Sequence, residues 1–467
     1  MTHTTPPRFL RPGRSRARCD AAGRGALALA LALTLVAAFA LTAPPAGAQA
    51  PAPGTTGASD TSGAAQPAEA PLPGRGVVVN IDSPERALYR IAVPDLAGQP
   101  SASADDGAPV LRSDFTLVGL FDVIDPRSYL NDPADGPLGV TRLPWSQIGA
   151  QGVVKGRVRP VGAELAVELR FYDLARGTAP VVSRHYQGSA RALRGFMHAF
   201  ASDVVKALTG EAAPFGTKLA FSRRLGPGEK AVYTADFDGH GLERISHEGG
   251  INMLPAFGPG GIWFSHLTKT GMFVTRAGLR GRPVLSGGGM TMGAIFCDGR
   301  VFFTSTRDGN SEIYSALPDG SDVRRLTNSP GIDVSPACGP KGRIAFVSTR
   351  HGSPQIFIMQ PDGTNVQRVT YRGSYNQTPV FCPDPKRSLI AFTGRDETMD
   401  IFTVDLETQQ YTRITQGQGS NKDPAFSPDC RMIAFYSTRG GIYIASPDGM
   451  SQHLVLKGPA ETLRWSH

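Results

Sequence analysis

The residues that could carry catalysis in this chain of 467 residues are scattered and complete no catalytic pattern. His247-Glu248 begins like the metal-binding helix of a zinc protease, but position 251, where the second histidine belongs, is isoleucine. Gly309-Asn310-Ser311 starts like the nucleophile turn of a hydrolase, and Ile313 stands where that turn needs glycine. The sequence therefore predicts a protein that is not an enzyme and that uses no metal ion and no cofactor.

Hydrogen bonding to a partner is the chemistry that remains. Short loops, each placed before a strand of the Pro-Ala-Phe type, repeatedly carry asparagine, aspartate or glutamine. Such side chains can bind another protein, and they can equally satisfy the backbone of their own turns. The candidates for partner contact are Asn252, Asp333, Tyr375, Asn376, Gln377, Asn421 and Lys422.

These loops belong to a unit that recurs six times between Lys218 and His467. A period of about 40–50 residues is typical of propellers, solenoids and repeat arrays. Each unit contains four short strand patterns, separated by turns such as Pro361-Asp362-Gly363, and no helical period. This favours the blade of a β-propeller, with the Pro-Ala-Phe strand innermost. The aromatic anchors of the units are Phe221, Phe264, Phe303, Phe346, Phe392 and Phe435.

The phase of the repeat predicts how the ring closes. The array begins with the second strand of a blade, Lys218 to Phe221, and the chain ends with an innermost strand, Thr462 to Ser466. We expect these two segments to pair in one shared blade, because pairing removes the open edges that an unclosed array would expose. The predicted fold is mainly β: a six-bladed propeller over residues 216–467.

The first 48 residues read as a secretory signal. Six arginines precede the uncharged stretch 26–43, and Ala46-Gly47-Ala48 is a small-residue cleavage site. An uncleaved membrane anchor is the alternative, and otherwise we expect no span after cleavage. The signal accounts for five of the eight net positive charges, which leaves +3 and little support for nucleic-acid binding. Residues 49–76 form a Pro/Ala/Gly/Ser/Thr linker that we predict to be disordered.

Four cysteines remain after the signal, at or next to the same part of the repeat in four different blades. We expect small buried residues without a bridge, and one disulfide between neighbouring blades is the alternative in an exported chain. Their spacing matches no zinc site. The four are Cys297, Cys338, Cys382 and Cys430.

Residues 77–212 predict a small α/β domain with a mixed sheet and two helices. Strand patterns occur at 77–81, 89–93, 121–124, 153–158, 165–171 and 181–186, and helical patterns at 109–120 and 190–209. The second helix keeps one apolar face and ends at Gly210, a residue suited to the position after a helix. His198 lies on this helix, and we expect it to be a packed or capping residue rather than a ligand.

The sequence resembles a known protein family. The blade pattern, with Pro-Ala-Phe-Ser-Pro-Asp at 424–429 and Ile-Ala-Phe-Tyr-Ser-Thr-Arg at 433–439, resembles the TolB family of the Tol–Pal envelope system. The segment 368–377 is also similar to a family segment before an inner strand. The resemblance covers about 77–467, and in the first domain it rests on Trp145, Gly149, Val153, Val154, Gly156, Leu208-Thr209-Gly210 and Phe215.

The resemblance implies a monomeric periplasmic scaffold that is not an enzyme. It implies that the propeller channel mouth binds Pal, the peptidoglycan-associated outer-membrane lipoprotein, and that a mature N-terminal segment binds TolA. Such a scaffold supports outer-membrane integrity and constriction during cell division. The implied TolA-binding segment is Val77, Val78, Val79, Asn80, Ile81, Asp82 and Ser83.

Two features depart from the family pattern. About 28 residues precede the implied TolA-binding segment after signal cleavage, and Leu285 to Met290 is a glycine-rich stretch in place of a regular strand and turn.

Two other functions stay open from the residues alone. An exported propeller that binds a small ligand or carbohydrate would place aromatic residues at the mouth, where Tyr375 is one. A peptidase propeller module would belong with a hydrolase domain and its nucleophile.

Overall fold

The computed structural model describes residue 1 and residues 88–132 and 136–466. The predicted signal (apart from Met1), the linker, the strand at 77–81 and the segment 77–83 lie outside the described residues. In the part of the chain that is described, no helix is both long enough and apolar enough to cross a bilayer.

The α/β domain contains one five-stranded sheet in the order β2-β1-β3-β4-β5. β1 pairs in parallel with β2 and β3, whereas β3-β4 and β4-β5 are antiparallel, so the sheet is mixed as predicted. Gly162 has φ +61°, which suits the tight turn between β3 and β4. The strands are β1 Tyr89–Ala92, β2 Phe121–Val123, β3 Gly152–Val161, β4 Glu164–Asp173 and β5 Val182–Gly188.

The helices of this domain pack on the sheet through apolar faces. α2 (Ala108–Leu117) and α4 (Leu193–Thr209) are the two predicted helices, and Gly210 ends α4 with φ +85°. A third helix, α3 (Arg142–Gln147), was not predicted, because six residues are too few to show a helical period. It is anchored by buried Trp145, whose Nε1 donates to Asp132 Oδ2 at 2.8 Å. The described 3₁₀ turns are η1 Ser101–Asp106, η2 Pro126–Ser128, η3 Ala190–Ala192 and η4 Pro340–Gly342.

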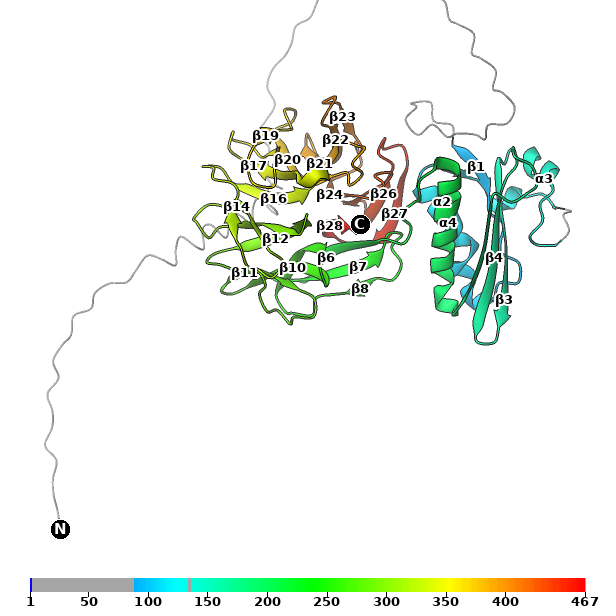
Figure 1. The fold of residues 1–467 in the computed structure, drawn as a ribbon, viewed down its shortest axis with the longest axis horizontal. Coiled ribbons are helices and arrows are strands. Elements are labelled where there is room, and N and C mark those ends of the chain that lie inside the picture. Colours follow the sequence, from blue (N-terminus) through cyan, green and yellow to red (C-terminus); the bar gives the residue numbers. More distant parts are fainter. Residues whose placement is uncertain (2–87, 133–135, 467) are drawn as a thin grey trace, which may run out of the picture. The chain divides into compact units, whose positions relative to one another are not determined.

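The C-terminal part is a six-bladed propeller (Figure 1). Four sheets have four strands each, and a seven-stranded sheet combines blades 1 and 2, which a single pair, Lys230 with Ile251, connects. Blades 1 and 2 contain β28 Glu461–Trp465, β6 Lys218–Gly226, β7 Glu229–Asp236 and β8 Glu243–Arg244, then β9 Ile251–Gly258, β10 Gly261–Thr268 and β11 Gly271–Arg276. Blades 3 and 4 contain β12 Thr291–Cys297, β13 Arg300–Ser305, β14 Glu312–Ala316 and β15 Arg324–Arg325, then β16 Asp333–Cys338, β17 Ile344–Ser348, β18 Gln355–Met359 and β19 Gln367–Arg368. Blades 5 and 6 contain β20 Tyr375–Phe381, β21 Leu389–Arg395, β22 Met399–Asp405 and β23 Tyr411–Arg413, then β24 Asn421–Phe426, β25 Ile433–Ser437, β26 Gly441–Ala445 and β27 Gln452–Lys457.

The ring closes as the repeat predicts. β28, from the end of the chain, pairs antiparallel with β6 in blade 1. β9, β12, β16, β20, β24 and β28 contact one another in a closed ring, so the Pro-Ala-Phe-type strands are innermost. Blade 2 has three named strands; beside β11, Leu285 forms an isolated bridge with Val274, and Met290 forms one with Met272. The glycine-rich stretch therefore covers the outer edge of this blade.

The cysteines correct a prediction. All four are paired, because the turns of neighbouring blades bring each pair of Cα atoms to within disulfide distance. Cys297 is bonded to Cys338, with Cα atoms 5.6 Å apart, and Cys382 to Cys430, with Cα atoms 5.5 Å apart. The expectation of unbridged cysteines was wrong, since alignment within the repeat hid how close adjacent blades come at this level.

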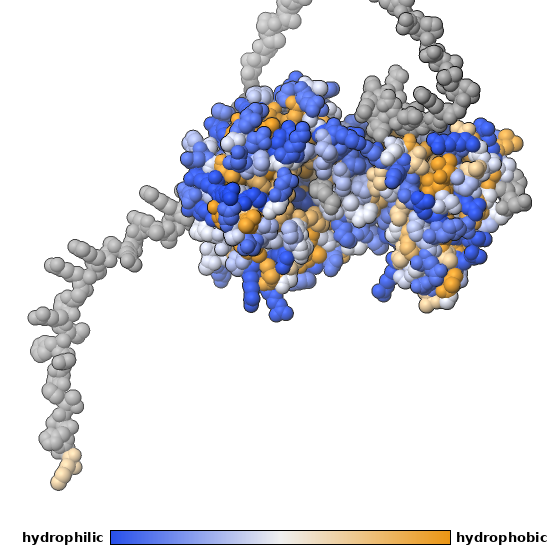
Figure 2. All heavy atoms as spheres, in the orientation of Figure 1, coloured by the Kyte–Doolittle hydropathy of each residue, from blue (hydrophilic) through white to orange (hydrophobic). Residues whose placement is uncertain are grey.

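Hydrophilic residues cover most of the propeller surface on the face shown in Figure 2. Apolar residues on that face occur in small groups. The large apolar side chains with the greatest exposure after Met1 are Met450, Tyr371 and Leu143, which belong to three different loops or helices. Scattered apolar residues of this kind are usual on a protein surface and do not mark a docking site.

Candidate functional site

We call the end of the ring at which the inner strands begin the mouth. The predicted contact residues lie there, at the start of β9, β16, β20 and β24. Four of the seven are buried and three are partly exposed. The buried residues are Asn252, Asp333, Asn376 and Asn421; the partly exposed residues are Tyr375, Gln377 and Lys422.

The buried residues hold the blades together. Asn376 Nδ2 donates to Oε1 of Gln355, in the preceding blade, at 2.8 Å, and Asn421 Nδ2 donates to Oδ1 of Asp400 at 3.2 Å. Asp333 N donates to Ser311 O, in the preceding blade, at 2.9 Å, and its Oδ2 accepts from Arg350 of the same blade at 2.8 Å. These contacts agree with the alternative that the loop residues satisfy their own structure. Partner contact by the mouth therefore rests on the three partly exposed residues.

Blades 3, 4 and 5 each have a buried acceptor at or next to the start of the third strand. In blade 5 this is Asp400, which accepts from Thr415 Oγ1 at 2.7 Å, while Ile401 N donates to the same hydroxyl at 3.0 Å. The corresponding acceptor–threonine pairs are Glu312 with Thr327 and Gln355 with Thr370. Our sequence reasoning missed this network. The signal was present, because an acidic or amide residue and a Leu/Ile/Val-Thr pair recur at fixed places in the units.

A second feature that the sequence concealed is a β-bulge in every inner strand. The pairing register shifts once in each strand, at a residue with positive φ. Five of these residues are not glycine, which is a strained backbone for an L-residue. Polar partners in neighbouring blades support the bulges; for example, Asp423 N donates to Thr393 Oγ1 at 3.1 Å. The bulge residues are Leu254, Gly293, Ser335, Thr378, Asp423 and Thr462.

Arginines surround the mouth in fixed positions. Arg307, Arg350 and Arg439 follow the ends of β13, β17 and β25, next to the first residues of the inner strands. Each Nε donates to the serine hydroxyl two residues earlier, and each guanidinium lies over an aromatic ring at 4.0–5.6 Å. Stacking and hydrogen bonding fix these cations in position. Because Arg350 is paired with Asp333, the positive charge of this ordered rim comes from Arg307 and Arg439.

Tyr375 and Gln377 are joined by a hydrogen bond within the mouth. Tyr375 Oη donates to Gln377 Oε1 at 3.0 Å. Burial raises the pKa of Tyr375, so the phenol stays protonated and remains a donor at neutral pH. Lys422 lies at the same level on β24, the neighbouring inner strand. These three side chains place a phenol, an amide and an ammonium group at the mouth.

One cluster of titratable residues lies away from the mouth. Oxygen or nitrogen atoms of Asp114, His198 and Asp238 all fall within 4.8 Å of one another, a grouping that could hold a metal ion. However, the guanidinium of Arg194 contacts the carboxylate of Asp238, and a positive charge there opposes a bound cation. His198 is packed, as expected, with its ring edge-on to Phe237. The cluster is an ion-pair network between α2, α4 and the turn after β7.

Comparisons with known proteins agree with this architecture. Residues 77–179 match the TolB amino-terminal domain, and residues 205–397 match the TolB beta propeller domain. The Tol-Pal system protein TolB of Anaeromyxobacter dehalogenans (strain 2CP-C) is 37% identical over 283 residues, which are 58% of this chain and 64% of that protein. That of Desulfosudis oleivorans is 32% identical over 269 residues, 54% of this chain and 60% of that protein.

A solved structure shows the same fold over both domains. TolB from Acinetobacter baumannii matches with a TM-score of 0.67 at 22% identity, over 81% of this chain and 96% of that chain. The matched segments span about three-fifths of the length of the curated relatives. Those relatives are named for the Tol-Pal system and not for a catalysed reaction. The two domain models occur in order and together cover more than half of the chain, which belongs to the TolB family.

Proposed function

We propose that this protein is a periplasmic scaffold of the Tol–Pal system that joins outer-membrane and inner-membrane components without catalysing a reaction. The observation that carries the proposal is the order of the two TolB domain matches, together with a propeller that presents a polar, basic mouth. In this function the mouth binds the lipoprotein Pal, and the segment 77–83 binds TolA. The complex supports outer-membrane integrity and constriction during division.

The mouth suits a partner with acidic and hydrogen-bonding groups. Arg307 and Arg439 provide fixed positive charge on the rim, where Arg350 is already paired with Asp333. Tyr375, Gln377 and Lys422 provide partly exposed polar groups nearer the channel. Charge complementarity of this kind speeds association and selects the partner. A few central residues of such an interface carry most of its binding energy.

A pull-down from detergent-solubilised envelopes tests the mouth. The purified, signal-cleaved protein should retain a peptidoglycan-associated lipoprotein, and the triple change Tyr375→Ala, Gln377→Ala and Lys422→Ala should weaken retention about tenfold or more. Gln367→Ala, on the exposed outer strand β19, is the matched control and should bind like wild type. Equal retention by wild type and the triple variant would place the lipoprotein elsewhere or exclude it.

Deleting residues 77–83 tests the second contact. The deletion should abolish retention of TolA and leave that of the lipoprotein intact, because the two contacts use different parts of the chain. Loss of both would indicate damage to the fold, which a melting curve would reveal. If no lipoprotein is retained and a soluble sugar or peptide raises the melting temperature instead, the ligand-binding propeller is the better function.

A further inference from the structure

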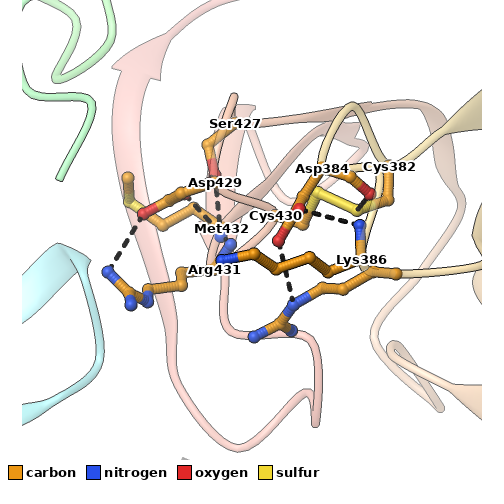
Figure 3. Close-up of a disulfide and its surroundings, with 9 residues drawn as sticks. Cys382, Asp384, Lys386, Ser427, Asp429, Cys430, Arg431 and Met432 are labelled. Carbon is orange, nitrogen blue, oxygen red and sulfur yellow. Dashed lines mark hydrogen bonds and ion pairs between the residues drawn. A yellow bond between two sulfur atoms is a disulfide. The ribbon is translucent and has the colours of Figure 1, made fainter. Parts of the chain in front are cut away.

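The Cys382–Cys430 disulfide joins two turns at the end of the propeller opposite the mouth. Cys382 follows β20 and Cys430 lies in the turn after β24, so the bond connects blades 5 and 6. Figure 3 shows that it brings the turn with Asp384 and Lys386 beside the turn with Ser427, Asp429 and Arg431. Both sulfur-bearing residues are fully buried. The bond therefore fixes the relative positions of two turns whose cysteines lie 48 residues apart in the sequence.

The two turns converge on one carboxylate of the segment between the domains. Lys386 Nζ lies 2.8 Å from Glu211 Oε1, and Arg431 Nη2 lies 3.2 Å from Glu211 Oε2. Glu211 comes directly after Gly210, which ends α4. The hydrogen bond and charge of Lys386, with help from Arg431, lower the pKa of Glu211, so this residue is ionised at neutral pH. One carboxylate thus connects α4 with two blades.

Arg431 depends on this carboxylate. Its side chain is 4% exposed, and its Nε and Nη1 atoms have no hydrogen-bond partner among the described residues. Asp429 supplies a second counter-charge, with Oδ2 3.6 Å from Nη1. A buried guanidinium that is short of acceptors is costly. The contact with Glu211 therefore supplies a counter-charge and an acceptor that the buried Arg431 guanidinium otherwise lacks.

The same two strands carry the exposed mouth residues at their other ends. β20 begins with Tyr375 and Gln377 and leads to Cys382, while β24 begins at Asn421, next to Lys422, and leads to Cys430. β20 and β24 are neighbours in the inner ring. Packed protein interiors compress little and transmit strain, so a displacement at one end of these strands can reach the other end. A physical connection thus runs from the mouth to the segment between the domains.

We propose that the Cys382–Cys430 disulfide, with Lys386 and Arg431 as a two-cation clamp on Glu211, couples the mouth ends of β20 and β24 to the α/β domain. The part of this proposal in which partner binding at the mouth affects the α/β domain rests on the proposed function. The clamp on Glu211 does not. The disulfide keeps the two cations at the spacing that one carboxylate can bridge. If partner binding at the mouth changes the free energy of the α4 contacts, a change in those contacts must alter the binding free energy at the mouth by the same amount.

The second disulfide provides a matched control within the chain. Cys297–Cys338 also joins the turns of adjacent blades, here blades 3 and 4. In the part of the chain that the structure describes, no hydrogen bond or ion pair connects those turns to residues 88–216. Removing either bond releases the same kind of constraint. Only the removal of Cys382–Cys430 should loosen Glu211.

Amide hydrogen exchange of residues 205–217, followed by mass spectrometry, tests the clamp in the full signal-cleaved protein. Exchange should rise about tenfold with Cys382→Ala and Cys430→Ala together, and also with Glu211→Gln, but not with Cys297→Ala and Cys338→Ala. Combining Glu211→Gln with Cys382→Ala and Cys430→Ala should add little, because both act through one set of contacts. Equal effects of the two disulfide variants, or additive effects in the combination, would overturn the proposal.

Glu211→Gln keeps the test valid if a cysteine variant does not fold, because Glu211 is about half exposed and its replacement leaves the core intact. A second arm adds the purified lipoprotein. It should slow exchange of 205–217 in the wild type and in the Cys297/Cys338 variant, and not in the Cys382/Cys430 variant. Binding without any change in exchange would contradict the coupling and leave the proposed function standing. A lipoprotein that does not bind would contradict the proposed function, and the clamp would then be judged on the first arm.

Discussion

His198 Nδ1 lies 2.8 Å from Asp114 Oδ2, and both side chains are buried where α2 and α4 meet. Nε2 of the same imidazole points toward Asp238 Oδ2, 3.6 Å away in the turn after β7. Arg194 contacts Asp238 and lies 3.7 Å from Asp106 on η1. Three carboxylates, one guanidinium and one imidazole therefore face one another where the α/β domain meets blade 1, and their charges balance best when the histidine is protonated.

Stability should fall as the pH rises through neutrality. Burial raises the pKa of Asp114 to about 7. Burial alone would lower the pKa of His198, but the hydrogen bond and charge of Asp114, with Asp238, raise it overall. Both groups thus hold protons more tightly in the folded protein. The stabilisation from Asp114 is fully present below its ordinary pKa of 3.8 and is lost by about pH 7, whereas that from His198 is fully present below 6.5 and is lost as the pH rises through its folded pKa. Melting curves between about pH 4 and pH 9 should show the decline, at most about 1.4 kcal/mol per pH unit for one proton.

His198→Gln is the control for this pH dependence. Glutamine keeps a hydrogen-bonding group near Asp114 and does not titrate, so the difference in stability between wild type and variant should shrink as the pH rises. An unchanged difference across the range would show that His198 does not carry a proton that the folded state prefers.

Arg194→Ala should be strongly destabilising. The carboxylate of Asp238 is 1% exposed, and removal of its guanidinium leaves a buried charge without its main partner. Breaking a buried pair in this way costs about 3–5 kcal/mol, and the partial exposure of Arg194 places the expectation at about 3. Arg184→Ala breaks a pair with Asp203 that is 47% and 32% exposed and should cost less than about 1 kcal/mol. Denaturant unfolding of both variants makes the comparison; equal losses would contradict a buried network.

Thr415→Val should destabilise blade 5 by about 1–3 kcal/mol. Its hydroxyl donates to buried Asp400 and accepts from Ile401 N, and valine of nearly the same shape can do neither. Thr370→Val should behave alike, because Gln355 and Ile356 repeat the contacts in blade 4. Thr412→Val, on partly exposed β23, is the matched control and should stay within about 0.5 kcal/mol of wild type in denaturant unfolding.

Much of the fold could be predicted because the sequence repeat indicates the strands of each blade and their order. Fixed positions of the Phe346-type anchors and of the Pro-Asp-Gly turns set strand number and order, and the phase of the units set the pairing of β28 with β6. The helix ending at Gly210 was predicted from its apolar face and its glycine. These are local patterns, and local patterns determine local structure.

The site was harder to predict because it depends on contacts between blades. A repeat pattern says which positions are equivalent, not which atoms meet across a blade boundary. Asn376 and Asn421 look like exposed loop residues in sequence, yet each donates to a buried acceptor one blade away. The same limit hid the Cys382–Cys430 bond, whose partners lie on neighbouring blades.

The bulge at Ser335 should tolerate glycine and reject a β-branched residue. Ser335 has φ +57° in β16, where the register shifts between Val334 and Ala337. Glycine relieves a backbone strain of about 1 kcal/mol and loses about as much through the flexibility of the unfolded chain, so Ser335→Gly should match wild type. Ser335→Val should cost about 1–2 kcal/mol, because a branched side chain is disfavoured at positive φ. Ser374→Val, in an exposed loop without positive φ, controls for the added apolar surface. Blade 3 has Gly293, also with positive φ, at the equivalent position. If Ser335→Val unfolded in denaturant like wild type, the prediction that the positive φ at this position disfavours a branched side chain would be wrong.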